Sequence, residues 1–387
     1  MRCLIMNHLL TNTSRPPNLH SLTGMRIFAA VLVFLFHASL SKMLNPFQDE
    51  QVANYYAVFF KNAGWLGVSF FFILSGFVLT WSANPNQTNG RFWLKRLGKI
   101  FPNHIVTWFV MLIFFNGYVK DSSAWLPNLF LVSSWSSNID IFVSVNQPSW
   151  TLCSELLFYI LFPFVLFVVR KIPNNFLLYT LFGTFVGLVL TQLAISQFVS
   201  SNPQLQEWPL SEKQWWLSYN FPPFRLYEFI AGMIMARLLQ AGWRLKLSLQ
   251  TCSFLVLGSY IATYFLPFQY SLNLVTFLPL CLLISAGAQS DLAGRKTILN
   301  ASLTVWLGEV SFGMYMVHYI VLIAAKKIMG GELYSTVSAL IIIFMCLCSS
   351  LFIGFLLHRY IEMPVMYRLN IFKNKSLIHP SESTPES

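Results

Sequence analysis

Apolar stretches close to 20 residues long recur along the whole of this 387-residue chain, and they constrain its fold more than any other feature. A helix of about 20 residues spans the roughly 30 Å hydrocarbon core of a bilayer, so each stretch is a candidate transmembrane helix. Charged residues make up only 10% of the chain, against about a quarter in soluble domains. The sequence therefore predicts an all-α, polytopic membrane helix bundle, and it excludes disordered, coiled-coil, collagen-like and disulfide-rich secreted classes.

About ten such stretches can be read, with boundary errors of roughly four residues. The first is short and carries Arg26 and His37, and the segment 121–148 is ambiguous because residues 139–145 could enter the membrane. The predicted spans are 25–40, 64–83, 103–119, 149–169, 174–198, 220–240, 248–266, 270–288, 302–325 and 336–358.

The 25 lysines and arginines are distributed unevenly between alternate loops. An even number of spans places both termini on one side, and most of the cations then lie in the loops on that side. Because cytoplasmic loops are enriched in Lys and Arg, both termini are predicted to be cytoplasmic. Cationic cytoplasmic loops of a membrane protein thus account for the net charge of +11, and no nucleic-acid partner is expected.

We predict one integral membrane domain, residues 25–364, as a multi-pass protein of the cell membrane. Residues 1–24 are expected to form a polar cytoplasmic segment, and 365–387 a cytoplasmic tail whose Ser, Pro and Glu content favours disorder. The six cysteines show no metal-ligand spacing, so neither a metal site nor a permanently bound cofactor is expected.

Ionisable residues within the predicted spans are candidates for function, since each costs roughly 2.5–3.5 kcal/mol or more at the membrane centre. Arg26 and His37 are eleven residues apart, which places them on one face of the first span, about 16 Å apart along its axis. Glu155 enters the fourth span with Tyr159 one turn deeper on the same face. This carboxylate is either a structural partner of a cation or histidine, or it orients a histidine or binds substrate hydroxyls.

Two later segments carry further polar groups inside the membrane. Arg225 and Glu228 stand at i and i+3, where they can neutralise one another, and a structural ion pair is the favoured interpretation. Ser311, Tyr315 and His318 lie on one face of the ninth span, which is predicted to meet a cavity or another polar helix. A structural stripe and a site are equally compatible with this pattern.

A basic segment begins the third span region, where Arg91, Lys95, Arg96 and Lys99 fall within nine residues. A positive-inside anchor explains these cations simply. Phosphate binding is the alternative if another feature requires a phosphorylated cytoplasmic ligand. From the chemistry of the residues alone, an enzyme and a transporter are equally compatible with the chain.

Seven short motifs follow one another in a recognisable order. They are L-T-G-M-R…H at 22–37, G-V-S-F-F-F-I-L-S-G-F at 67–77 with Ser75, R-L-G-K-I-F-P at 96–102, W-T-L-C-S-E-L-L-F-Y at 150–159, F-R-L-Y-E-F-I-A-G at 224–232, S-F-G-M-Y-M-V-H at 311–318 and R-Y-I-E-M-P at 359–364. Together they resemble the membrane-bound acyltransferase family 3, in the form without a fused extracytoplasmic hydrolase domain. Two positions depart from the family pattern, since Lys99 replaces an arginine and Cys153 a serine.

The resemblance implies transfer of an acyl group, usually acetyl, from cytoplasmic acyl-CoA to a hydroxyl, most often on a sugar of a surface glycan, exported lipid or metabolite. An alcohol must lose its proton as it attacks, so His37 would be the general base. Glu155 would orient an imidazole or bind acceptor hydroxyls, and Arg26 would contact the donor or balance charge. A covalent acyl-histidine route stays open.

The resemblance also implies binding roles. The basic segment, foremost Arg96 and Lys99, would hold the anionic CoA, although lysine loses the bidentate phosphate contact of arginine. The partners would thus be acyl-CoA as co-substrate, a carbohydrate or glycolipid acceptor, and the lipid bilayer. Candidates for contacts to the substrates are His318, Tyr315, Ser75, Tyr159, Arg225 and Glu228.

Two alternatives remain. A multi-pass transporter of an anionic solute, or of an acyl or glycan intermediate, would use the basic mouth and the intramembrane His and Glu residues as its pathway. Neither repeats nor Gly/Pro-broken helices in matched positions are visible to support it. An inactive relative acting as a membrane sensor is disfavoured because every motif keeps its ionisable residue.

Overall fold

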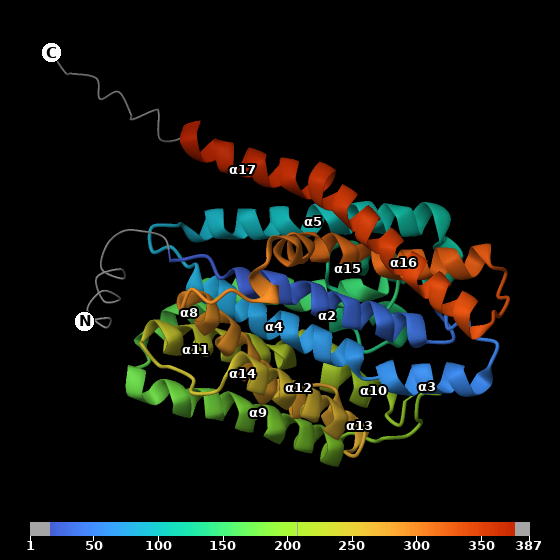
Figure 1. The fold of residues 1–387 in the computed structure, drawn as a ribbon, viewed down its shortest axis with the longest axis horizontal. Coiled ribbons are helices and arrows are strands. Elements are labelled where there is room, and N and C mark those ends of the chain that lie inside the picture. Colours follow the sequence, from blue (N-terminus) through green and yellow to red (C-terminus); the bar gives the residue numbers. More distant parts are fainter. Residues whose placement is uncertain (1–15, 207, 376–387) are drawn as a thin grey trace.

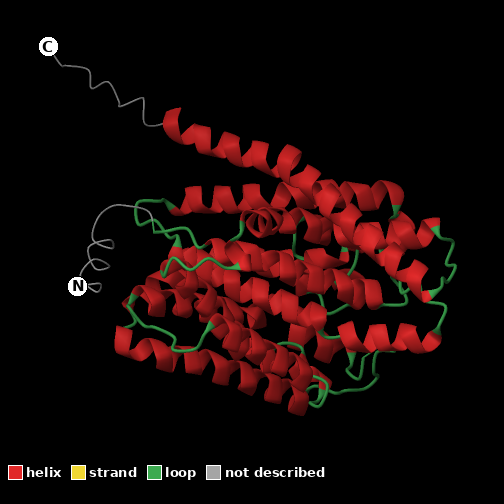
Figure 2. Ribbon diagram, viewed as in Figure 1, coloured by secondary structure: helices red, strands yellow, loops and turns green. Residues whose placement is uncertain are grey.

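The computed structural model describes residues 16–206 and 208–375. Over these ranges the chain forms a bundle of helices whose long axes run roughly along the length of the molecule, with no β-strand (Figures 1 and 2). The all-α fold class is thereby confirmed. Residues 1–15 of the predicted N-terminal segment and 376–387 of the predicted tail lie outside the described residues.

Consecutive long helices run in opposite directions. Helix α2 (His20–Ser39) leads away from the end of the bundle where the described chain begins, which we call the terminal end, and α4 (Ala63–Trp81) returns to it (Figure 1). The other α-helices are α3 (Glu50–Phe60), α5 (Asn89–Phe114), α6 (Trp125–Leu129), α7 (Ile139–Phe142), α8 (Trp150–Lys171), α9 (Leu177–Phe198), α10 (Glu212–Trp215), α11 (Leu226–Gln240), α12 (Leu249–Ala262), α13 (Phe268–Ser271), α14 (Leu274–Leu292), α15 (Ser302–Ile328), α16 (Thr336–Leu357) and α17 (Met363–Lys375).

Eight helical segments of the described chain are long and apolar enough to cross a membrane. Two of the ten predicted spans, 220–240 and 248–266, correspond instead to the 15-residue α11 and the 14-residue α12. Helices of that length rise only about 22 Å, less than the roughly 30 Å hydrocarbon core. The eight segments are His20–Ser39, Glu50–Trp81, Asn89–Phe114, Gln147–Lys171, Asn174–Phe198, Phe268–Leu292, Ser302–Ile328 and Thr336–Asn370.

Proline explains why α11 is short. The helix α10 passes through a π-helical turn, Trp216–Asn220, and the chain then breaks at Pro222 and Pro223 before α11 begins at Leu226. Proline has no backbone N–H to donate and its ring clashes with the preceding helical turn, so two in succession interrupt the helix. Near the other end of the chain a helix extends further than predicted. Helix α17 continues into 365–387, the tail that was predicted to be disordered.

Backbone contact joins α4 to α11. A Cβ atom at Gly76 would lie 1.9 Å from the Phe229 carbonyl oxygen, and one at Gly232 would lie 1.9 Å from the Ile73 carbonyl oxygen. Both distances are far below van der Waals contact, so only glycine fits at either position. Small residues are the usual means by which membrane helices approach this closely.

Residues 115–149 form a cap at the end of the bundle opposite the terminal end. They make short helical turns together with α6 and α7, in place of a further long helix. Asn128 Nδ2 donates to Ser149 Oγ at 2.8 Å within the cap, and Asn146 Nδ2 fastens the cap to α15 by donating to the Met316 carbonyl oxygen at 2.9 Å. The ambiguous segment 139–145 belongs to this cap.

Candidate active site

His37 and His318 come from helices far apart in sequence and meet inside the bundle. His37 lies near the end of α2 and His318 on α15, and His318 Nε2 is 3.1 Å from His37 Nδ1. The two side chains are 7% and 1% exposed. The face that carries His318 was predicted to meet a cavity or another polar helix, and in the structure His318 meets His37 of α2.

Backbone carbonyl groups indicate which nitrogen of each ring carries the hydrogen. His318 Nδ1 lies 2.6 Å from the Tyr315 carbonyl oxygen, and His37 Nδ1 lies 2.9 Å from that of Val33. A carbonyl oxygen only accepts, so both Nδ1 atoms are donors. In the neutral rings the lone pairs are then on Nε2, and that of His318 faces His37 Nδ1. We infer from these partners that His37 Nε2 is the nitrogen left to accept a proton.

His37 lines a cavity of about 400 Å³ beneath the cap, which we call the His37 cavity. Cap residues form part of its wall, including Lys120 and Asp140, whose charged groups are 3.3 Å apart and exposed to solvent. Nine aromatic side chains also line it. They are Phe36, Trp65, Tyr118, Trp150, Trp208, Trp215, Tyr219, Tyr315 and Tyr319.

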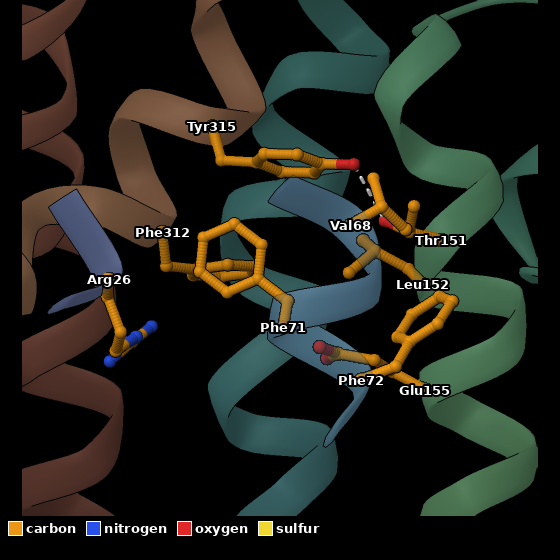
Figure 3. A pocket seen from close by; sticks show the side chains of 9 residues that line it. All are labelled: Arg26, Val68, Phe71, Phe72, Thr151, Leu152, Glu155, Phe312 and Tyr315. Carbon is orange, nitrogen blue, oxygen red and sulfur yellow. Dashed lines mark hydrogen bonds between the residues drawn. The ribbon is translucent and has the colours of Figure 1, made fainter. Parts of the chain in front are cut away.

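A smaller pocket of about 40 Å³, the Glu155 pocket, lies on the terminal side of this cavity. Figure 3 shows Arg26 and Glu155 on opposite sides of it, with the rings of Phe71 and Phe312 between them. Glu155 Oε2 accepts a hydrogen bond from the Tyr159 hydroxyl at 3.0 Å. Glu155 thus lies with Arg26 and Tyr159, and within the described residues no hydrogen bond joins it to a histidine.

Tyr315 lies between the two spaces, since it lines both the His37 cavity and the Glu155 pocket. Its hydroxyl is 3.0 Å from Thr151 Oγ1 and 3.2 Å from the Pro148 carbonyl oxygen. Val68 is the other residue that lines both. The ring of Tyr315 therefore forms the partition between a wide cavity on one side and a narrow, charged pocket on the other.

The four cations of the basic segment have different surroundings. Lys99 forms an ion pair with Glu362, which also lies 3.2 Å from His358 Nδ1 and accepts from Asn103 at 3.3 Å. Arg96 instead lines a wide cleft at the terminal end. Sequence reasoning missed Glu362 as a partner, although the R-Y-I-E-M-P motif contains it. Arg91 and Lys95 are half-buried in the first turns of α5.

Arg225 and Glu228 form the buried ion pair that their spacing predicted. Arg225 Nη2 lies 2.9 Å from Glu228 Oε2, with both side chains fully buried. The guanidinium carbon also lies 4.5 Å from the ring centroid of Tyr219 and 5.0 Å from that of Phe72. Since Tyr219 lines the His37 cavity, the pair supports the cavity wall from behind. Ser75 is half-buried on α4, one helical turn from Phe71.

This arrangement suits general-base chemistry. A neutral histidine with an unoccupied acceptor nitrogen at a cavity wall can remove the proton of a hydroxyl that enters the cavity. The residues predicted to be catalytic fall into two groups, with His37 on one side of Tyr315, and Arg26 and Glu155 on the other. Within the described residues no cluster of His, Cys, Asp and Glu side chains could hold a metal ion.

Comparison with known families decides the class of enzyme. The sequence profile of acyltransferase family 3, described as an acyltransferase domain, matches residues 19–359. The chain belongs to this family. The resemblance read from the seven motifs is confirmed, and the protein is a membrane O-acyltransferase. The matched region contains both histidines, Arg26 and Glu155 and ends just before Glu362.

This family-3 acyltransferase covers different shares of the length of its relatives. Acyltransferase MdmB of Streptomyces mycarofaciens is 35% identical over 91% of this chain and 92% of its own. Exopolysaccharide production protein ExoZ of Rhizobium meliloti is 27% identical over 79% and 90%. Peptidoglycan O-acetyltransferase OatA of Listeria monocytogenes is 24% identical over 77% of this chain but 48% of its own, so the chain spans about half of that relative. No solved structure matches.

Proposed function

We propose that this acyltransferase moves an acyl group, most simply acetyl, from acyl-CoA to a hydroxyl of a carbohydrate held in the His37 cavity. The observation that carries the proposal is a line of three spaces along two helices. On α8, Trp150 lines the His37 cavity, Glu155 the Glu155 pocket, and Arg170 the cleft at the terminal end. On α4, Trp65 and Leu79 line the first and the last of these. The Glu155 pocket and the cleft share no lining residue among those described, so a donor would have to pass along α8 between them, and donor and acceptor would then meet at Tyr315 from opposite ends.

The charge distribution supports the direction of approach. The terminal end carries the basic segment. If cationic loops lie on the cytoplasmic side of the membrane, this end faces the cytoplasm. CoA is anionic and cytoplasmic, so it would enter at this end with its thioester directed toward Tyr315. The His37 cavity would then admit the acceptor from the other face.

The lining of the His37 cavity supports a carbohydrate acceptor. Sugar rings stack their C–H faces on tryptophan, and Trp65, Trp150, Trp208 and Trp215 all line this space. Polar groups at the cap, such as Gln147 and Asp140, offer partners for hydroxyl groups. The names of ExoZ and OatA, exopolysaccharide production protein and peptidoglycan O-acetyltransferase, also point to carbohydrate polymers.

The proposed reaction uses His37 as both base and acid. Its Nε2 atom takes the proton of the acceptor hydroxyl while that oxygen forms a bond to the thioester carbonyl carbon. The C–S bond then breaks, and the CoA thiolate receives the proton from His37. Through this cycle His318 Nε2 accepts from His37 Nδ1 and stabilises the transient imidazolium. The Tyr315 hydroxyl, at the partition, donates to the Pro148 carbonyl oxygen in the structure, and it would exchange that hydrogen bond for one to the developing oxyanion.

The proposal is tested with purified protein in detergent or nanodiscs. Acetyl-CoA should raise the melting temperature, because a ligand of the folded state stabilises it. Label from radioactive acetyl-CoA should pass to glycan or glycolipid acceptors in the presence of the wild-type protein. The variant His37→Ala should keep the thermal shift and lose the transfer. Absence of both shift and transfer at saturating acetyl-CoA would contradict the proposed donor, and transfer by His37→Ala would contradict the base.

A further inference from the structure

A cleft of about 800 Å³ opens at the terminal end, between the loop 82–88 with the start of α5 and the last turns of α8. We call it the basic cleft. Its lining has three cations, several phenylalanines and three side-chain amides, and no aspartate or glutamate. The residues that matter for its chemistry are Arg96, Arg170, Lys171, Phe92, Phe162 and Asn84.

The cations of the cleft are arranged for an anionic ligand. Arg96 Nε is buried and has no hydrogen-bond partner within the described residues, which leaves a charged donor unsatisfied. Arg170 and Lys171 extend from the opposite wall and are exposed. Arg237 on α11 lies close enough to Arg170 to add to the positive potential. Phosphate groups, with several acceptor oxygens each, match such a set of donors.

The rest of the lining suits a planar, hydrogen-bonding group. The rings of Phe92 and Phe162 stack with centroids 4.9 Å apart, and both line the cleft. Phe162 is only 4% exposed, so the half-buried Phe92 is the ring of this pair that a nucleobase could contact. The amides of Asn84, Gln87 and Asn89 can both donate and accept, as recognition of a base edge requires.

The position of the cleft fits one end of a long donor. Arg170 is fifteen residues beyond Glu155 on α8, which places it about 22 Å further along the helix axis. A ligand with phosphates at Arg170 and a flexible arm directed along α8 would bring its far end to the Glu155 pocket. CoA is built in this way, with a phosphorylated nucleotide joined to the thioester by a pantetheine arm.

We propose that the basic cleft binds the phosphorylated adenosine of the acyl-CoA donor, with Arg170 and Lys171 as phosphate-binding residues alongside Arg96. The inference rests on the proposed function, because it assumes that donor. It adds a site on α8 that lies outside the seven motifs. An anionic lipid headgroup shares the phosphate chemistry, so the test must separate the two.

The experiment measures binding by titration calorimetry in nanodiscs of neutral phosphatidylcholine, with CoA, adenosine 3′,5′-bisphosphate and pantetheine as probes. In Arg170→Ala/Lys171→Ala, the Kd for CoA and for the bisphosphate should each rise about tenfold or more, while any binding of pantetheine is unchanged. The matched control is Arg295→Ala/Lys296→Ala, which removes two exposed cations from another loop at the same end. It should leave all three Kd values unaltered.

Several outcomes would overturn the site. An unchanged Kd for CoA in Arg170→Ala/Lys171→Ala would overturn the site, although acyl-CoA would remain the proposed donor. An equal rise of the Kd for CoA in the control variant would also overturn it. An effect seen only when phosphatidylglycerol is added to the discs would assign the cleft to lipid. If CoA does not bind the wild-type protein at all, the proposed donor fails, and this site fails with it.

Discussion

His318 Nε2 lies 3.1 Å from His37 Nδ1, so the base of the proposed reaction is backed by a second histidine whose own hydrogen is committed to the Tyr315 carbonyl oxygen. This contact affects how His37 can act as a base. His37 can take a proton on Nε2 only if Nδ1 keeps its hydrogen, and His318 provides an acceptor for that hydrogen.

The first prediction concerns His318. In His318→Leu the His37 Nδ1 hydrogen keeps the Val33 carbonyl oxygen as acceptor but loses the second one, and kcat should fall about 10- to 100-fold with little change in the KM for acetyl-CoA. His318→Gln, whose side-chain oxygen can accept in the same place, should recover part of the rate. The check is CoA release at saturating donor and acceptor. Equal losses in the two variants would show that the volume of His318 matters and its lone pair does not.

The second prediction concerns the charges of the Glu155 pocket. Glu155→Gln keeps an acceptor for Tyr159 but removes the charge opposite Arg26, and should lower kcat about tenfold or more without loss of folded protein. Arg26→Gln should have a similar effect. Because both charges border one pocket, the double variant should lose less than the product of the two single losses. Strictly multiplicative losses would argue that the two residues act independently.

The third prediction distinguishes a structural role of Arg225 and Glu228 from a role in substrate binding. Arg225→Met leaves a buried carboxylate unpaired and should destabilise the protein by about 3–5 kcal/mol, which is measured as a fall in melting temperature. Arg225→Met/Glu228→Leu removes both charges and should recover much of that stability. A double variant that is stable but has a greatly raised acceptor KM would instead place the pair in the binding site.

The fourth prediction concerns the contact between α4 and α11. Gly232→Ala introduces a methyl group against the Ile73 carbonyl oxygen and should lower the melting temperature or prevent folding. The control is Gly183→Ala on α9, where a Cβ meets no neighbour and helix propensity alone applies, worth up to about 1 kcal/mol in favour of alanine. Equal behaviour of the two variants would show that the helices tolerate separation.

The fifth prediction concerns the acceptor. Trp208 packs against Phe268 with ring centroids 5.0 Å apart, and it lines the His37 cavity from the loop between α9 and α10. Trp208→Ala should raise the acceptor KM severalfold and leave the KM for acetyl-CoA unchanged. The measurement is initial rate against acceptor concentration at saturating acetyl-CoA. A selective change in the donor KM would contradict placement of the acceptor here.

Local patterns predicted the helices well, because hydrophobic runs and their length depend on neighbouring residues in the chain. They overestimated α11, since two prolines interrupt the helix near the start of a run that remains hydrophobic on average. Motifs also suggested the residues of the candidate site but not their partners. His37 and His318 are 281 residues apart, and Lys99 and Glu362 are 263 apart. Such pairings depend on how the helices pack, which no single segment encodes.

The same limit applies to Glu155. Its position in the fourth span was predicted, and a histidine was one expected neighbour. Packing of α8 beside α4 instead places it on the other side of Tyr315 from His37. The aromatic lining of the His37 cavity was not predicted either, because Trp65, Trp150 and Trp208 come from three separate segments and converge only in the folded bundle.

The cap, residues 115–149, walls the His37 cavity without contributing a long helix to the bundle. It is not independent of the bundle, because the Asn146 side chain donates to the Met316 carbonyl oxygen on α15, the helix that carries His318. The wall of the cavity and the helix behind the histidine pair are thereby joined, so a sequence change in the cap would be transmitted to the histidines as well as to whatever the cavity holds.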